Sequence, residues 1–192
     1  MTARWVVDVV QPERDLEVTW QPISLLRKND PASDSEYRGP VETTHNMLRV
    51  MESLRAADGD DAFFKAYWEF GTRIHHDKDR DFDLGEALSA AGLDPTHAVA
   101  ATDPSFDDEI ARRMDNGLAL VGDDVGTPLI AMDDDNGDRV GMFGPVITRA
   151  PGGETGLKLW DHFVGLTQVP GIWEIKRTRT ESPDFGDRPS PS

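Results

Sequence analysis

The first regular pattern begins almost at the first residue of the chain. Four apolar residues recur at helical spacing and predict a helix with hardly any chain ahead of it; they are Trp5, Val6, Val9 and Val10. Residues 16–20 then alternate apolar and polar positions, which predicts a β-strand. A helix followed by a strand is the second half of a βαβ unit, so we expect the first strand of that unit to be missing from this sequence.

The chain from Asp30 to about Val121 has a helical pattern interrupted by capping signals. Stripes of apolar residues at three- and four-residue spacing predict four or five successive helices. Asp94-Pro95 and Asp103-Pro104 each place a capping carboxylate before a proline, which needs no hydrogen-bonding N–H in the first turn of a helix. The stripes are Met47, Met51 and Leu54; Phe63, Ala66, Tyr67 and Phe70, from Asp60 to Gly71; Leu84, Ala87, Leu88 and Ala91, from Asp83 to Gly92; and Phe106, Ile110, Met114, Leu118 and Val121.

A β-hairpin is predicted after the helical region. Two apolar runs, at 128–132 and 139–143, flank a turn with Asn136-Gly137, two residues that tolerate the positive φ angles of tight hairpin turns. A final helix is predicted from the spacing of Leu157, Trp160 and Val164. Residues 181–192 are rich in Pro, Ser, Asp and Gly, a composition typical of a disordered tail.

Net charge narrows the range of partners. The 192 residues carry a formal charge of -16, which repels phosphate backbones and anionic lipid surfaces, so we expect neither a nucleic-acid nor a membrane partner. No stretch approaches the roughly 20 apolar residues that cross a bilayer, and the N-terminus has no signal-peptide pattern. These features predict a cytoplasmic protein. The basic cluster at 176–179 is expected to form internal ion pairs in so acidic a chain.

Candidate chemistry is sparse. The chain contains no cysteine, which excludes a disulfide, a thiolate metal site and a cysteine nucleophile within these residues. The alternating aspartates that begin at Asp77 do not form an EF-hand, because the sixth and twelfth positions hold Phe82 and Leu88 instead of Gly and Glu. We therefore predict no metal site. Phosphate-binding loops, nucleophile elbows and His-Glu-x-x-His motifs are also absent from the sequence.

The order of the predicted elements and several short strings resemble one family. The order is helix, strand, helical region, long helix, Gly-Thr-Pro, hairpin and helix, which is similar to a DsbA-like thioredoxin-fold protein without its first strand and active-site turn. The strings resemble the actinobacterial branch described as mycothiol-dependent nitroreductases. They are Glu36-Tyr37-Arg38-Gly39-Pro40, Gly71-Thr72-Arg73-Ile74-His75, Val121-Gly122-Asp123-Asp124-Val125-Gly126-Thr127-Pro128, Phe143-Gly144-Pro145-Val146 and Lys176-Arg177-Thr178-Arg179-Thr180.

The resemblance implies an α/β, thioredoxin-like fold with an all-helical insertion. Residues 1–29 and 116–180 would form the thioredoxin-like domain and residues 30–115 the insertion. The first central strand, which ends in a Cys-Pro-x-Cys turn in the family, is missing from this sequence. Its absence is expected to leave the strands at 16–20 and 128–132 as unpaired edges, and to weaken the protein or favour aggregation.

Three explanations for this absence stay open. They are a misplaced start codon or otherwise shortened chain, a natural cysteine-free pseudo-enzyme, and a wrong family assignment. We favour the first, because the opening helix keeps Trp5 and its valine face. It predicts that the DNA just upstream encodes, in frame, an apolar strand and a Cys-Pro-x-Cys turn.

The resemblance also implies a function. The family's cysteine sits at a helix N-terminus, where the dipole stabilises a thiolate that attacks disulfides or thiol adducts. We expect a thiol-dependent oxidoreductase that binds no resident cofactor, uses mycothiol or a similar small thiol as co-substrate and reduces an electrophilic or disulfide substrate. Without cysteine, this chain is expected to be inactive. The oligomeric state is left open.

Seven residues are candidates for the site. The resemblance assigns Gly126, Thr127 and Pro128 to a cis-proline loop beside the active site. The possible pocket-lining residues are Asn29, Tyr37, Phe143 and Pro145. Two alternative functions are a cysteine-free binding or scaffolding module, and a glutathione-dependent isomerase with a serine nucleophile. The second is disfavoured because Thr2 is the only hydroxyl at the start of the first helix.

Overall fold

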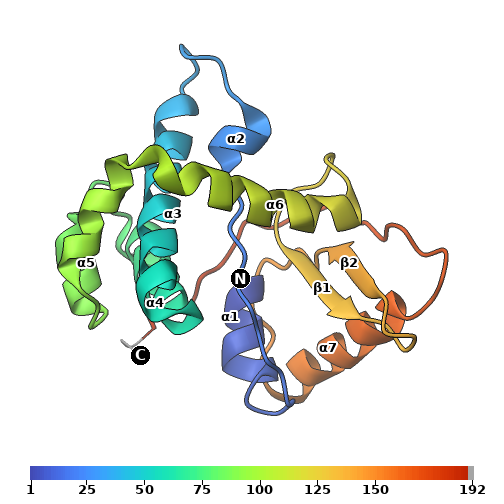
Figure 1. Cartoon of the computed structure of the whole chain (residues 1–192). Coiled ribbons are helices and arrows are strands. Elements are labelled where there is room, and N and C mark those ends of the chain that lie inside the picture. Colours follow the sequence, from blue (N-terminus) through green and yellow to red (C-terminus); the bar gives the residue numbers. More distant parts are fainter. Residues whose placement is uncertain (190–192) are drawn as a thin grey trace. The chain divides into compact units, whose positions relative to one another are not determined.

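The computed structural model describes residues 1–189 and divides them into two compact units. Unit 1 contains Met1–Val18 and Asn116–Gly186, and unit 2 contains Thr19–Asp115 together with residues 187–189. The described chain is mixed α/β, mostly helical with one two-stranded sheet (Figure 1). None of its described helices is long and apolar enough to cross a bilayer. The two units are described separately below.

Unit 1 confirms the predicted N-terminal helix, hairpin and final helix. Helix α1 (Thr2–Trp5) continues as a π-helical turn, Val6–Val10. Strands β1 (Leu129–Asp133) and β2 (Arg139–Phe143) pair antiparallel, and α7 (Gly153–Thr167) follows. The hairpin turn is stabilised by Asp134, whose carboxylate accepts the N–H groups of Asn136 and Asp138.

Unit 1 has its hairpin between two helical layers. On one face, β2 lies against the end of α6 (Asp107–Val121), where a Cβ added to Gly141 would lie 2.7 Å from the Cβ of Leu120. The side chain of Met142 alternates to the opposite face and packs on a core formed by α1, the π-helical turn and α7. Buried residues of that core are Trp5, Val6, Val10, Trp160 and Phe163.

The strand predicted at 16–20 is not formed. This segment runs extended but pairs with no strand, and in the described chain the sheet consists of β1 and β2. The alternation instead reflects packing, because Leu16 and Val18 are partly buried against the core of unit 1. A strand needs a hydrogen-bonded backbone partner as well as alternating side chains. The expectation of an unpaired strand edge at residues 16–20 is therefore wrong, because these residues form no strand.

Unit 2 is built from helices, all of them predicted except the short first one, which lies before Asp30. They are α2 (Leu25–Asn29), α3 (Arg38–Asp58), α4 (Asp60–Thr72) with a π-helical turn Arg73–Asp77, α5 (Leu84–Ala90), the 3-10 helices Pro95–Thr102 and Pro104–Phe106, and the first part of α6. Asp83, Asp94 and Asp103 cap their helices as predicted, each by accepting a backbone N–H two or three residues ahead. Gly71 does not end α4, because the helical backbone continues to Asp77 and stops at Lys78, whose φ is 60°.

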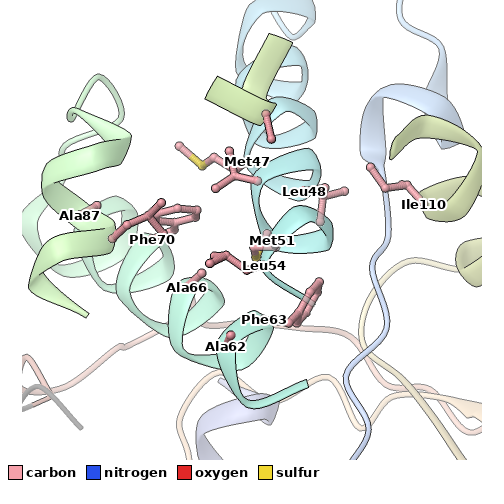
Figure 2. Close-up of a cluster of buried hydrophobic side chains, with 13 residues drawn as sticks. Met47, Leu48, Met51, Leu54, Ala62, Phe63, Ala66, Phe70, Ala87 and Ile110 are labelled. Carbon is pink, nitrogen blue, oxygen red and sulfur yellow. The ribbon is translucent and has the colours of Figure 1, made fainter. Parts of the chain in front are cut away.

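The core of unit 2 lies between α3, α4 and α5 (Figure 2). The apolar stripes predicted from helical spacing meet there, and four of their residues are fully buried: Leu54, Ala66, Ala87 and Leu88. Figure 2 shows the stripe of α3 facing that of α4. Because each stripe recurs every three or four residues, each helix presents one continuous apolar face to its neighbours.

The C-terminal segment corrects one expectation. Lys176, Arg177 and Arg179 are exposed, and no ion pair involves them within the described residues, so internal pairing of this cluster is wrong. Farther along, the N–H of Asp184 donates to the Thr148 oxygen at 2.7 Å, and its carboxylate pairs with an arginine of the same unit. Of the tail predicted at 181–192, residues 190–192 lie outside the described part of the chain.

Candidate functional site

Two proline-containing loops meet at the open end of the hairpin in unit 1. The Thr127–Pro128 and Gly144–Pro145 peptide bonds are both cis. The register of the hairpin places Leu129 opposite Phe143, so the residues just before β1 and just after β2 are neighbours. The N–H of Gly144 donates to the backbone oxygen of Pro128 at 2.9 Å, which ties the loops together.

The first turn of α1 joins the same place. The hydroxyl of Thr2, which is buried, donates a hydrogen bond to the backbone oxygen of Pro145 at 2.8 Å. Thr2 stands 143 residues from Pro145 in the sequence, so this contact depends entirely on the tertiary fold. The N-terminal end of α1 therefore lies against the second proline loop.

The aromatic ring of Phe143 lies over the first loop. A Cβ added to Gly126 would lie 3.7 Å from the Cε2 atom of Phe143, an ordinary contact distance. Gly126, Thr127 and the Phe143 side chain are exposed, whereas Pro128 and Pro145 are half-buried. The structure thus brings five of the seven sequence candidates together in unit 1, with polar backbone and an aromatic edge open to solvent.

The other two candidates belong to unit 2. Asn29 is the exposed last residue of α2, and Tyr37 precedes α3 with 67% of its surface exposed. The backbone N–H of Tyr37 donates to the hydroxyl of Ser35 at 3.3 Å, a local turn contact. That Asn29 and Tyr37 line a pocket with the proline loops stays a prediction.

The sequence reasoning missed a hydrogen-bonded chain in unit 2. The Ser24 hydroxyl lies 2.9 Å from Nδ1 of His45, whose Nε2 lies 3.1 Å from Oδ1 of Asp107. Arg49 donates two hydrogen bonds to the Asp107 carboxylate, which holds the pKa of Asp107 below its ordinary value. Only the capping role of Ser24, which accepts the N–H of Arg27, has a local sequence signal.

These hydrogen-bonded side chains have a structural role. Only 1% of the surface of Ser24 is exposed, and its oxygen is already the cap of α2, so no substrate can reach it as a nucleophile. His45 is also buried. The contacts link α2, α3 and α6 around a polar centre.

The residues of the proline loops include no thiol nucleophile. The sequence contains no cysteine, and the described residues contain no group of three or more His, Cys, Asp or Glu side chains suited to a metal ion. Backbone N–H and C=O groups, a threonine hydroxyl and an aromatic ring can position a substrate. A reacting sulfur would have to come from outside these residues.

Comparisons with known proteins identify the class. The chain belongs to the Rv2466c-like family, whose model is described as mycothiol-dependent nitroreductase Rv2466c and matches residues 1–177. It is also similar to an uncharacterized protein of Mycobacterium tuberculosis, Rv2286c, with 29% identity over 98 residues, or 51% of this chain. The matched stretch spans 37% of the length of that relative.

Proposed function

We propose that this chain forms part of a thiol-dependent oxidoreductase that uses mycothiol as co-substrate. The match to a family described as mycothiol-dependent over residues 1–177 carries this proposal. In the reduction of a nitro group to a nitroso group, two mycothiol thiols become one disulfide and supply the two electrons and two protons that release water. The substrate is a small electrophilic or disulfide molecule, and the protein works in the cytoplasm of an actinobacterium.

The proposed architecture is a DsbA-like thioredoxin fold. Residues 1–29 and 116–180 form the thioredoxin-like domain, and residues 30–115 form the helical insertion. Support comes from the order of α1, α6, the hairpin and α7, and from the hydrogen bond that holds Thr2 against Pro145. Gly126, Thr127 and Pro128 form the loop that faces the reacting sulfur, and Phe143 and Pro145 border it. Asn29 and Tyr37 are the proposed contribution of unit 2.

The chain as given performs recognition without the redox step. Thiol–disulfide chemistry starts from a thiolate, and these 192 residues contain none. Mycothiol binding and catalytic turnover, which an active enzyme combines, are therefore expected to be separate in this chain. Mycothiol should bind beside the proline loops, and no turnover should follow with a nitro substrate.

Nuclear magnetic resonance of the 192-residue chain tests this separation. Addition of mycothiol should shift the backbone amide signals of Gly126, Thr127 and Gly144, and should leave those of α5 unchanged. Thr127→Pro, which removes the N–H of that residue, should weaken binding. Thr102→Pro, at the exposed end of the 3-10 helix Pro95–Thr102 of unit 2, is the matched change. Shifts confined to unit 2, or turnover without cysteine, would contradict the proposal.

The lack of cysteine favours a second candidate function, a binding or scaffolding module. A binding or scaffolding module would keep the proline loops and perform no chemistry. This module predicts no mycothiol-dependent shifts at Gly126 or Thr127. The same titration therefore distinguishes the two functions.

A further inference from the structure

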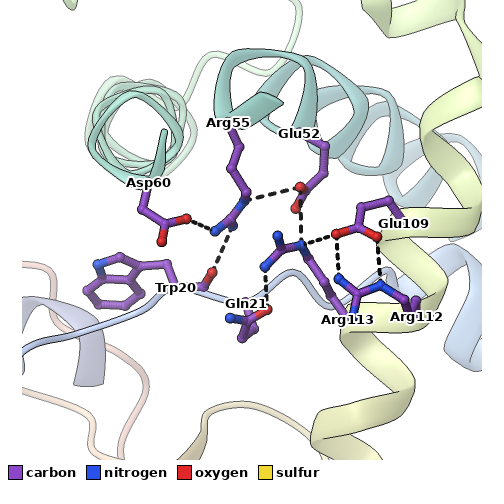
Figure 3. Close-up of polar contacts among 8 residues, drawn as sticks. All are labelled: Trp20, Gln21, Glu52, Arg55, Asp60, Glu109, Arg112 and Arg113. Carbon is purple, nitrogen blue, oxygen red and sulfur yellow. Dashed lines mark hydrogen bonds and ion pairs between the residues drawn. The ribbon is translucent and has the colours of Figure 1, made fainter. Parts of the chain in front are cut away.

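A buried ionic network lies where the chain enters unit 2. Trp20 and Gln21 stand close to the start of the unit, and Arg113 stands near the end of the part of α6 that belongs to it. Figure 3 shows Glu52 and Arg55 of α3 pointing between these two segments. The network is separate from the proline loops and does not depend on the proposed function.

Glu52 is the least exposed member of this network. Its side chain is 2% exposed, and its Oε2 lies 3.1 Å from Nε of Arg55 and 3.5 Å from Nε of Arg113. Within residues 1–189, its Oε1 and the Nε of Arg55 have no hydrogen-bond partner. Burial is the main reason that the pKa of Glu52 is raised, and it outweighs the opposing effect of the two arginines.

Both arginines continue from Glu52 to the segment that enters the unit. The Nη2 of Arg55 donates to the backbone oxygen of Trp20 at 2.7 Å, and the Nη1 of Arg113 donates to Oε1 of Gln21 at 3.1 Å. In each arginine, therefore, Nε lies toward the carboxyl group of Glu52 and an Nη atom donates to Trp20 or Gln21. The segment contributes neutral oxygens only.

Two other carboxylates compete for the same arginines. Asp60, at the start of α4, pairs with Arg55. Glu109 of α6 lies 2.7 Å from Nε of Arg113 and also pairs with Arg112. The charged groups that act on Glu52 are thus Arg55 of α3 and Arg113, Glu109 and Arg112 of α6, and Asp60 of α4 acts through Arg55. When Glu52 loses its charge, Arg55 keeps its ion pair with Asp60. Arg113 keeps its ion pair with Glu109, whose 2.7 Å distance is already shorter than the 3.5 Å to Glu52.

We propose that Glu52 is a proton-controlled clamp on the entering segment. The ionised carboxylate holds Arg55 and Arg113 in the positions from which they bind Trp20 and Gln21. Protonation removes this attraction and leaves Arg55 paired with Asp60 alone and Arg113 paired with Glu109 alone, so that residues 19–21 loosen from α3 and α6. Trp20 lies 35 residues from Arg55 in the sequence, and Gln21 lies 92 residues from Arg113, so the clamp joins distant parts of the chain.

Fluorine NMR of the full chain labelled with 5-fluorotryptophan tests the clamp. Trp20 stacks on Phe64 and Tyr67 at ring distances of 5.1 and 5.7 Å, so its signal reports on any movement of the segment. Trp20→Phe identifies this signal among those of the five tryptophans. The signal should titrate with one midpoint above the ordinary glutamate value of 4.5.

Three variants distinguish the clamp from a general effect of acid. Glu52→Gln should abolish the titration and hold the Trp20 signal at its low-pH position. Arg113→Gln removes one cation beside Glu52 and should raise the midpoint. Glu69→Gln, which breaks an ion pair with Arg73 inside α4, should titrate like the parent protein. A Trp20 signal that titrates in Glu52→Gln, or a midpoint that Arg113→Gln leaves unchanged, would overturn the proposal.

Discussion

The indole nitrogen of Trp5 donates a hydrogen bond to the backbone oxygen of Gly156 at 3.1 Å, inside the core of unit 1. The rings of Trp5 and Trp160 meet edge to face at 5.9 Å in the same core. The start of the chain is therefore attached to α7 by both a polar contact and an aromatic contact. The close approach depends on the absence of a side chain at Gly156.

Gly156→Ala should destabilise unit 1. A Cβ at this position would lie 2.5 Å from the Pro151 oxygen and 2.7 Å from Cγ1 of Val9, so backbone or core must move. We expect a loss of about 2 kcal/mol in the free energy of unfolding, measured by urea denaturation. Gly165→Ala, in the same helix with open space around it, should instead be neutral or stabilising. Equal effects of the two changes would refute the steric explanation.

Leu54→Ala should destabilise unit 2. Leu54 is fully buried between α3 and α4, so truncation removes apolar contacts and leaves a cavity. The expected cost is roughly 2–5 kcal/mol in the free energy of unfolding, measured by chemical denaturation. Val99→Ala is the matched control, because Val99 is 79% exposed and its truncation should change stability little. A cost for Leu54→Ala no greater than that of the control would contradict the packing described above.

Ser24→Ala should uncouple α2 from α3. The change removes the cap on the N–H of Arg27 and leaves Nδ1 of buried His45 without its partner. Together these losses should cost about 2 kcal/mol of unfolding free energy, and hydrogen exchange in α2 should accelerate. Ser89→Ala removes an exposed hydroxyl that bonds to Gly85 within α5, and it should leave exchange in α2 unchanged. Unaltered exchange in Ser24→Ala would show that the contacts of Ser24 are not formed.

Glu109→Gln should flatten the acid dependence of stability. Hydrogen bonds from Arg112 and Arg113 lower the pKa of Glu109 from 4.5 to about 2. A carboxyl with a lowered pKa contributes stability above its unfolded value, and this contribution disappears as the pH falls from 4.5 through about 2. Urea denaturation at several pH values in that window should show a smaller loss for the variant. Glu86→Gln, at an exposed position of α5, should retain the full loss.

Local patterns predicted most of the helices and their starts. Asp83, Asp94 and Asp103 act as caps because capping depends on a backbone N–H only two or three residues away. The hairpin also follows from local chemistry, because Asn136 and Gly137 favour a tight turn between apolar runs. The prediction ended the helix at Gly71, whereas α4 ends at Thr72 and a π-helical turn continues to Asp77, since a glycine inside a helix lowers stability without forbidding the conformation.

The candidate site could be predicted only in part. The family resemblance predicted that Gly126 to Pro128 belong to the site. The hairpin register explains why Phe143 and Pro145 lie beside them. No local signal places Thr2 on the oxygen of Pro145, because the contact spans 143 residues. The role of these residues in binding stays a prediction.

The amino-acid sequence by itself determined the helical periodicity, the caps, the turn and the lack of a thiol nucleophile in these residues, because each depends on residue type or on neighbours a few positions away. Tertiary structure alone decided that residues 16–20 form no strand, because strand formation needs a backbone partner from elsewhere in the chain. It also decided that Glu52 would be buried between Arg55 and Arg113. A sequence pattern indicates which apolar side chains are buried, but only the folded chain determines which charged groups are desolvated next to one another.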